Sequence, residues 1–434
     1  MLPLDYVHAI VLVGVALYMW TREPARILLT PLLLISSFIL YGAGNIVYFA
    51  GAETIPEVHR AVTLCLIFMW IFMLAGIELA RAWTARSSAR FALVTRTWKS
   101  APITDRRDSD RLLIAIGLLT AAYLIGVFLY LGKPGQILEF VSLQSASDKV
   151  KYRHDFGADG GYIYQTLLAC VAPFLSFLYF IKGAVSKRPQ VFAVGLLICA
   201  VVLAGKIGTF QKSPWVVYLL QLIVVWQVVR SLKFGLGRAL MLAIVTVGGV
   251  VLAVAIALPQ IDWPDLFEWL SYRFFEVNNE GIYQTLYVYP HYLPHTWGMN
   301  IGLVHSIFEN GDMVPAYSRV ASLFGAEGAT FDAFFIGDAW VDFSYGGVIV
   351  ISLLVGFLVK LIDVFTINLG KTPLTIALIG SGMYGLFQLL VNSAFTAFLS
   401  GGLVIIPLVV AASIALMNDL SRPAGRLGAR PTPP

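Results

Sequence analysis

Two carboxyl groups placed four residues apart are the first candidates for chemistry in this sequence. Asp338 and Asp342 stand in a short aromatic run directly before a long apolar stretch. On a helix this spacing places both groups on one face, where like charges repel. Such a pair calls for a nearby cation, a hydrogen-bonding sugar or a proton on one member. Alternatively, both acids favour the positive end of the helix that follows.

Basic residues gather in three polar segments, at 132–161, 205–214 and 259–345. They are Lys133, Lys149, Lys151 and Arg153, then Lys206 and Lys212, then Arg273 and Arg319. Guanidinium and ammonium groups match phosphate oxygens. We therefore expect an anionic, membrane-bound ligand, such as a lipid phosphate or diphosphate.

Several of these positions also have a purely structural interpretation. Lys133 and Lys149 fit solvated surface positions, and Lys206 and Lys212 can snorkel from the edge of the membrane. His154 can cap the following helix or pair with the neighbouring carboxylate.

The start of the segment 259–345 predicts an amphipathic helix at the membrane surface, with Asp262 as its cap and Pro264 in its first turn. Its apolar face carries Trp263, Phe267, Leu270, Phe274 and Val277. Arg273, Glu276 and Glu280 fall on one edge of that face. They can act on a ligand, or Arg273 can simply pair with Glu276.

Three histidines in the same segment, His291, His295 and His305, raise the possibility of zinc. Pro290 and Pro294 argue against a helix that would place the first two on one face, and a zinc site needs further ligands. We therefore expect neither a metal nor another cofactor.

Nucleotide and nucleic-acid chemistry find no support. The run Gly205-Lys206-Ile207-Gly208 lacks the spacing of a phosphate-binding loop. The three cysteines, Cys65, Cys170 and Cys199, lie within apolar stretches and are typical of core residues.

Composition shows which elements must position these side chains. Hydrophobic residues make up 58% of the 434 residues and charged residues only 13%, with a mean hydropathy of +0.79. This predicts an all-α polytopic membrane protein. Eleven spans are expected, at 5–20, 27–50, 61–80, 112–131, 162–181, 191–205, 214–229, 239–258, 346–362, 374–397 and 401–417.

The distribution of basic residues predicts the orientation. With the N-terminus outside, alternating loops place 21 of the 30 Lys and Arg residues inside. Lys360 is counted with these inner residues, and the basic segment 81–111 is expected to lie on anionic lipid. The first apolar stretch has no cationic segment before it, so it is expected to be retained as a membrane helix.

The chain is expected to divide into four parts. Residues 1–258 hold eight spans with outer loops 132–161 and 205–214. Residues 259–345 form a long outer loop, residues 346–420 hold three spans, and residues 421–434 form a disordered inner tail.

The run Gly337-Asp338, Asp342-Phe343 and Gly346-Gly347, followed by a hydrophobic helix with Gly356, resembles the closing motif of bacterial oligosaccharide repeat unit polymerases. These are the Wzy-type polymerases of O-antigen and exopolysaccharide. The resemblance covers most of the chain in layout, with one long outer loop late in the sequence, but matches residues only in short stretches.

Two further segments carry the resemblance. One is the basic, glycine-containing segment from Arg153 to Gly161 before a mid-chain helix. The other is Lys212-Ser213-Pro214, where the family often has Arg-Gly. Lysine presents a point charge and not the guanidinium fork, so this position departs from the family pattern.

The resemblance implies a metal-independent glycosyltransferase of GT-C-like architecture in a bacterial inner membrane, with a periplasmic N-terminus and a cytoplasmic C-terminus. It would move a growing glycan from undecaprenyl diphosphate to a hydroxyl of a second lipid-linked repeat unit. A chain-length regulator and a flippase are possible partners, and no nucleic acid is expected.

Roles for individual residues follow from this resemblance. Arg153, Lys212 and Arg273 are expected to bind the donor diphosphate. Arg319 is a further candidate for the same role.

Asp338 is expected to activate the acceptor or bind sugar, with His154 and Glu276 as alternatives. An O-antigen ligase shares the layout. A lipid-linked oligosaccharide transporter would instead need a charged central cavity and inverted repeats, which the sequence does not show.

Overall fold

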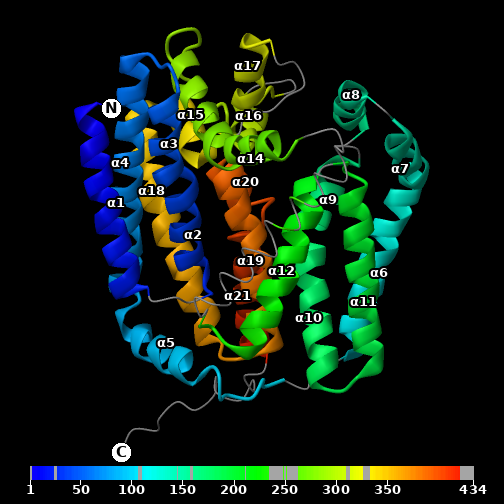
Figure 1. Ribbon diagram of the computed structural model, residues 1–434. Coiled ribbons are helices and arrows are strands. Elements are labelled where there is room, and N and C mark those ends of the chain that lie inside the picture. The colour runs from blue at the N-terminus through cyan, green and yellow to red at the C-terminus, as the bar shows by residue number, and fades with distance from the viewer. Residues whose placement is uncertain are drawn as a thin grey trace, which may run out of the picture.

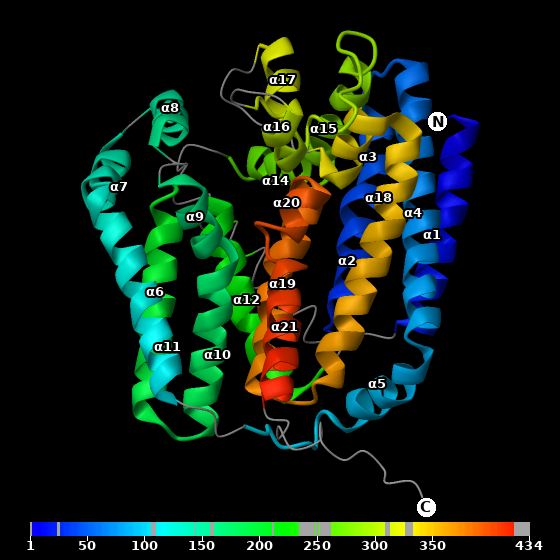
Figure 2. The same cartoon turned by 180° about the vertical axis from the view of Figure 1, so that it is seen from behind.

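The computed structural model describes residues 2–23, 27–105, 110–143, 145–156, 160–210, 212–233, 248, 251, 262–308, 313–325 and 333–420. Within these ranges it does not describe the side chains of residues 86–89, 110, 146, 147, 150, 154, 212, 269, 273, 274, 303 and 417–420. The secondary-structure elements in the described ranges are all helices, without strands among them (Figures 1 and 2).

The helices fall into three runs along the chain. The first run holds α1 (Pro3–Arg22), α2 (Leu29–Ser37), η1 (Phe38–Ala43), α3 (Gly44–Gly51), α4 (Pro56–Trp83) and α5 (Ala85–Thr97). The second holds α6 (Asp110–Tyr130), α7 (Lys133–Ser142), α8 (Ala146–Phe156), α9 (Gly161–Thr166), η2 (Leu167–Val171), α10 (Ala172–Val185), α11 (Pro189–Ile207) and α12 (Lys212–Arg230). The third holds α14 (Trp263–Ser271), η3 (Tyr272–Glu276), α15 (Val277–Val288), α16 (Gly302–Phe308), α17 (Ala316–Leu323), α18 (Phe334–Asn368), α19 (Pro373–Val391), α20 (Ala394–Phe398) and α21 (Ile405–Leu420).

Nine helices in the described part of the chain are long and apolar enough to cross a membrane. They coincide with nine of the predicted spans, which confirms an all-α membrane protein. The predicted span 239–258 lies outside the described residues, except for its isolated positions 248 and 251. The predicted span 401–417 corresponds to α21, whose apolar part, Ile405–Leu416, is shorter than a usual crossing helix. The total of eleven therefore stays a prediction.

The predicted span 374–397 is interrupted. Helix α19 ends at Val391 because Asn392 has an extended backbone, and the Ser393 hydroxyl then accepts the backbone N–H of Thr396 to begin α20. A side chain that caps a new helix competes with continuation of the old one. This break returns the chain towards the segment that carries Asp338.

The helix that contains the predicted span 346–362 begins earlier than the apolar pattern indicates. Helix α18 starts at Phe334, inside the stretch assigned to the outer loop, and continues to Asn368 with a kink at Phe343 and Ser344. Phe335 and Val341 are fully buried. The aromatic run is thus part of the packed core and holds the two carboxyl groups on a helix.

Segments predicted to share one side of the membrane lie together at one end of the molecule. The backbone N–H of Thr104 donates to the Lys371 carbonyl over 2.9 Å, and Lys182 pairs with Asp105 over 3.1 Å. Helix α5 lies at this end, whereas α7, α8 and α14–α17 lie at the opposite end with the start of α1 (Figure 1). The alternation is thus the predicted one, and which compartment each end faces stays a prediction.

Helices α4 and α18 make the closest approach between two spans. A Cβ atom on Gly76 would lie 2.1 Å from the Leu353 carbonyl oxygen, and one on Gly356 would lie 2.0 Å from the Met73 carbonyl oxygen. Small residues allow this contact between backbones, which stabilises helix pairs in lipid. The packing fixes the long helix that carries Asp338 and Asp342.

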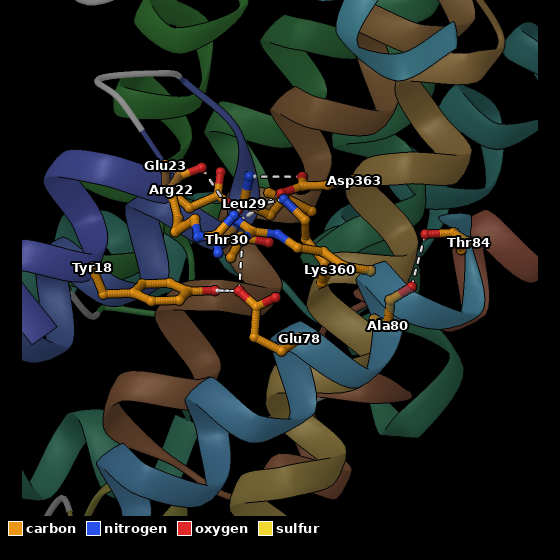
Figure 3. Close-up of polar contacts among 11 residues, drawn as sticks. Tyr18, Arg22, Glu23, Leu29, Thr30, Glu78, Ala80, Thr84, Lys360 and Asp363 are labelled. Carbon is orange, nitrogen blue, oxygen red and sulfur yellow. Dashed lines mark hydrogen bonds and ion pairs between the residues drawn. The ribbon is translucent and has the colours of Figure 1, made fainter. Parts of the chain in front are cut away.

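A largely buried ion cluster joins α1, α4 and α18 at the end of the molecule opposite α14–α17 (Figure 3). Glu23, directly after α1, accepts from Arg81 over 2.6 Å and from Lys360. Arg81 also pairs with Glu78, which accepts the hydroxyl of Tyr18. Lys360, counted with the inner loops, is thus a buried residue inside α18.

A carboxylate on the next turn of α18 fixes the start of α2. The two oxygens of Asp363 accept the backbone N–H groups of Leu29 and Thr30, each over 2.9 Å (Figure 3). These N–H groups begin a helix and have no partner within it. No local pattern predicts this contact, since Asp363 and the start of α2 are more than 300 residues apart in the chain.

Candidate functional site

The two carboxyl groups of α18 occupy different environments, although they share a helix face as predicted. Asp342 is buried, with 3% of its surface exposed, whereas Asp338 is partly exposed. Both lie before the kink at Phe343 and Ser344, at the end of the molecule where α14–α17 gather.

Asp342 holds the loop 296–300. Its Oδ1 atom accepts from the Thr296 hydroxyl over 2.5 Å and from the backbone N–H groups of Gly298 and Asn300 over 3.0 and 3.2 Å. Three donors on one oxygen stabilise the charged form of a carboxylate. The interpretation of Asp342 as an acid drawn to a helix end does not account for these bonds. Its role is to position the loop.

Asn300 connects this loop to the second carboxyl group. Its side-chain amide donates to Oδ1 of Asp338 over 2.8 Å, and its amide oxygen accepts the backbone N–H of Ala316, at the start of α17, over 2.9 Å. The Asn300 side-chain amide is the only hydrogen-bond partner of the Asp338 carboxyl group within the described residues. The second oxygen of Asp338 therefore keeps its capacity to accept a proton or a hydroxyl group.

A small cavity lies beside Asp338. Its lining includes Asn300 and Asp342 with Phe335 from α18, and Ser393 from the break before α20. Its volume of about 20 Å³ admits one water molecule and no sugar ring. A sugar therefore fits only with one hydroxyl group in the cavity at Asp338 and with its ring outside the cavity.

Tyr289, directly after α15, is influenced by both Arg319 of α17 and the two carboxyl groups. Burial raises the pKa of the Tyr289 hydroxyl, the Arg319 guanidinium lowers it, and Asp338 and Asp342 raise it further. Opposite and like charges shift a pKa in these two directions. The buried Tyr289 hydroxyl thus lies between the charged group of α17 and those of α18 in its electrostatic environment.

The Arg319 guanidinium has donors to spare. Its Nε atom donates to the Val314 carbonyl over 2.9 Å, and no carboxylate pairs with it in the part of the chain that the structure describes. Of the predicted diphosphate ligands, Arg319 is one whose side chain is described, and it shares with Asp338 an electrostatic influence on Tyr289.

The helix predicted at the start of this segment is present as α14, which ends at Ser271 before η3. Leu266 and Leu270 are buried, whereas Trp263 and Phe267 are 64% and 60% exposed, so Leu270 does not share the exposure of the two aromatic residues. Exposed aromatic rings are typical of contact with lipid. A position of α14 at the membrane surface stays a prediction.

The cation and acids that follow α14 lie on η3 and α15. Glu276 ends η3 and is partly exposed, and the Arg273 side chain lies outside those described. Glu280 accepts from the Tyr272 hydroxyl over 2.8 Å and from the Gln284 amide over 2.9 Å. These two hydrogen bonds hold the Glu280 carboxylate at the edge of the helix. The described residues form no ion pair with it.

Arg153 and His154 lie on α8, and Lys212 is the first residue of α12. Arg153 is exposed, and the side chains of His154 and Lys212 are not described. In both views α8 stands over α6, α7 and α9, apart from α14–α17 (Figures 1 and 2). The described structure therefore gives these residues no contact with Asp338.

Lys133 corrects the expectation of a solvated surface residue. It is 2% exposed, and its ammonium group donates to the Phe156 carbonyl and lies 5.2 Å from the centre of the Phe210 ring. It joins α7 to the end of α8. Its role in the described structure is thus to fix the arrangement of the outer loop 132–161.

The histidines are dispersed among aromatic and backbone contacts. His295 lies 3.2 Å from the Val341 carbonyl, and the His291 ring lies beside Tyr287. Among the residues that the structure describes, no three His, Cys, Asp or Glu side chains are grouped as metal ligands.

Sequence reasoning missed Thr296, Asn300 and Tyr289. Their residue types are common in loops, and nothing in their spacing links them to Asp338. The contacts depend on the backbone path of residues 289–300, which no periodic pattern encodes.

A comparison with protein-family models, curated proteins and solved structures finds no match for this chain. The functional argument therefore rests on the geometry described above.

Proposed function

We propose that this protein is a membrane glycosyltransferase that extends a lipid-linked glycan, as a polysaccharide polymerase does. The observation that supports it best is the environment of Asp338. Asn300 holds one of its oxygens, and the carboxyl group lines a cavity large enough for a hydroxyl group. Arg319, to which the described residues give no carboxylate partner, shares with Asp338 an electrostatic influence on Tyr289.

In the proposed reaction, the acceptor hydroxyl oxygen attacks the anomeric carbon of the donor glycan. Asp338 takes the hydroxyl proton as general base. A new glycosidic C–O bond forms while the C–O bond to the diphosphate breaks, and polyprenyl diphosphate leaves with the bonding electron pair.

Cations would stabilise the negative charge that develops on the leaving group. We assign this role to Arg319, together with Arg153, Lys212 and Arg273 as the other proposed diphosphate ligands. The donor and acceptor are both anchored in lipid in this proposal, which fits a site beside the surface helix α14.

The test is reconstitution of the purified full-length protein with lipid-linked repeat units alone. A ladder of longer glycans is the expected product, and Asp338→Asn should abolish it. The exposed acid Glu268 of α14 offers a matched control, since Glu268→Gln removes a carboxylate at the same end of the molecule. Absence of elongation by the folded wild-type protein would sink the proposal.

The rival functions give different products in the same system. A ligase transfers finished glycan only when a lipid A core acceptor is added. A transporter moves the lipid-linked sugar across the bilayer without elongating it. Parallel Glu276→Gln and His154→Gln variants test the alternative bases, because only the true base should give a pH-dependent loss of turnover.

A further inference from the structure

Lys206 is a buried cation without a counter-ion. It lies in the last turn of α11 with only 2% of its surface exposed. Its ammonium nitrogen lies 4.7 Å from the centre of the Tyr384 ring on α19, and it makes no hydrogen bond or ion pair within the described residues. A buried charge in this state requires an explanation.

The other buried lysines of the described residues have polar partners. Lys182 pairs with Asp105 over 3.1 Å, and Lys360 pairs with Glu23. The ammonium group of Lys133 donates to the Phe156 carbonyl. Lys206 differs from all three, because the described residues give it neither a carboxylate nor a hydrogen-bond acceptor.

The described neighbours of Lys206 do not supply an anion. A cation–π contact offsets only part of the cost of an uncompensated buried charge. The Cys170 thiol in η2 donates to the Thr166 carbonyl over 3.3 Å and so is engaged as a neutral group. These contacts leave the ammonium group without an anionic partner among the described residues.

A second unpartnered polar group lies on the adjoining helix. The Thr166 hydroxyl, one turn before Cys170, is buried and has no hydrogen-bond partner among the described residues. Leu168 packs against the backbone of α11 at Gly205, directly before Lys206. The turn that contains Thr166 and the end of α11 are therefore packed together.

Polar residues connect Lys206 to the cavity beside Asp338. Tyr384 and Gln388 are spaced by four residues on one face of α19, and the amide of Asn392, directly after α19, donates to Gln388 over 2.6 Å. Ser393, the next residue, lines the cavity. At 1.5 Å per residue, Tyr384 lies about 10 Å along the helix axis from Val391, the last residue of α19.

We propose that Lys206 binds the phosphate of an anionic membrane lipid, with Tyr384 and Thr166 beside it. The proposal adds a cation to the donor site, and it rests on the proposed function for the choice of polyprenyl diphosphate as that lipid. The phosphate supplies a counter-charge that the described residues do not provide, and Tyr384, Gln388 and Asn392 lead from it towards the cavity beside Asp338.

The direct test measures lipid binding to the purified full-length protein by native mass spectrometry. The probes are polyprenyl diphosphate, polyprenol, phosphatidylglycerol and inorganic pyrophosphate. Wild-type protein should retain polyprenyl diphosphate, and Lys206→Met should weaken that binding at least 10-fold. Lys206→Arg should retain most of it, because the charge is preserved.

The partly exposed Lys149 provides the matched control, and Lys149→Met should bind as the wild type does. Retention of pyrophosphate alone would assign the site to a free phosphate source, and retention of phosphatidylglycerol would assign it to bulk lipid. In each case, loss with Lys206→Met supports a phosphate site at Lys206. Equal binding by Lys206→Met of every phosphate probe overturns it.

Folding must be separated from binding, because Lys206 is buried. Thr166→Val keeps the charge and nearly the shape of the site, and it should weaken binding by a smaller factor than Lys206→Met. If Lys206→Met does not give monodisperse protein, unchanged binding by both Lys206→Gln and Thr166→Val overturns the proposal.

Binding and elongation fail independently. Lysine-dependent lipid binding without elongation would support the phosphate site and contradict the proposed transferase. Elongation with unchanged binding and unchanged KM for the donor in Lys206→Met would support the transferase and remove Lys206 from its donor site.

Discussion

The side-chain amide of Asn300 donates a hydrogen bond of 2.8 Å to Oδ1 of Asp338. The backbone N–H of the same residue donates to Asp342, so a single loop residue joins both carboxyl groups of α18. Asp342 positions the loop and the loop positions Asp338. The two acids that share a helix face thus have separate tasks.

Asp338→Asn should lower the rate of elongation about 100-fold or more, the range expected for loss of a general base. The amide keeps the size of the side chain but cannot take the proton from the acceptor. The measurement is single-turnover elongation of lipid-linked repeat units.

The control for this prediction is a thermal unfolding curve for each variant. Asp338→Asn should unfold within a few degrees of the wild type, as should Glu268→Gln. A folded Asp338→Asn protein with full activity would remove Asp338 from the chemistry.

Asn300→Ala and Asn300→Asp separate positioning from charge. The alanine variant leaves Asp338 without its described hydrogen bond and should lower turnover about 10-fold to 100-fold, as expected for a misplaced catalytic group. The aspartate variant replaces a donor with a third carboxylate and should be less active than the alanine variant at neutral pH. Raising proton concentration should recover activity in Asn300→Asp more than in Asn300→Ala.

The opposite order of the two Asn300 variants would show that the amide does not act through Asp338. A pH profile of turnover for both variants and the wild type provides the test, because a purely structural loss would lower all points of the profile equally.

The sequence predicted the helical class and most of the spans because long apolar stretches determine them locally. It also placed Asp338 and Asp342 on one helix face, because a spacing of four residues is sufficient for that inference. The amphipathic helix α14 followed from the same kind of periodic pattern.

The remaining features depend on contacts between distant segments. Lys360 pairs with Glu23, and Lys133 donates to the Phe156 carbonyl. Both contacts depend on tertiary packing that no local sequence pattern specifies. Asn300 likewise reaches Asp338 only because the loop 296–300 is anchored by Asp342. Contacts with distant residues therefore determine which charged side chains are engaged in the fold and which can still bind a ligand.

Arg319→Gln should raise the KM for the lipid diphosphate donor about 10-fold to 100-fold, the loss expected for hydrogen bonds between charged groups. The substitution removes the bond from Arg319 Nε to the Val314 carbonyl, but this contact is exposed, so the glutamine variant should still fold. The effect should shrink at high salt, where phosphate binding by the wild type is screened. Initial rates over a range of donor concentrations give the value.

The matched control for Arg319 is Arg153→Gln, an exposed arginine on α8. Both variants should raise donor KM if α8 contributes to diphosphate binding. A change confined to acceptor KM in Arg319→Gln would contradict its proposed role.

Glu23→Gln should destabilise the protein by about 3–5 kcal/mol, the cost of breaking a buried ion pair from one side. The variant leaves Lys360 without its carboxylate and takes one partner from Arg81 (Figure 3). Lys360→Met should cost less, because Glu23 keeps Arg81. Chemical denaturation in detergent micelles measures the difference, and equal losses in the two variants would contradict the assigned sharing of Glu23.

Gly356→Ala should destabilise the pair α4 and α18 by about 1–3 kcal/mol, because the added methyl group would lie 2.0 Å from the Met73 carbonyl oxygen. The helices must separate to admit it, which moves the segment that carries Asp338. Gly14→Ala in α1 is the control, since nothing lies within 4 Å of its added Cβ atom. Alanine also favours a helix over glycine by about 1 kcal/mol, so Gly14→Ala should leave the unfolding midpoint unchanged or raise it. Thermal unfolding and elongation are measured on both variants. A Gly356→Ala protein as stable and active as Gly14→Ala would show that the close backbone contact does not position the site.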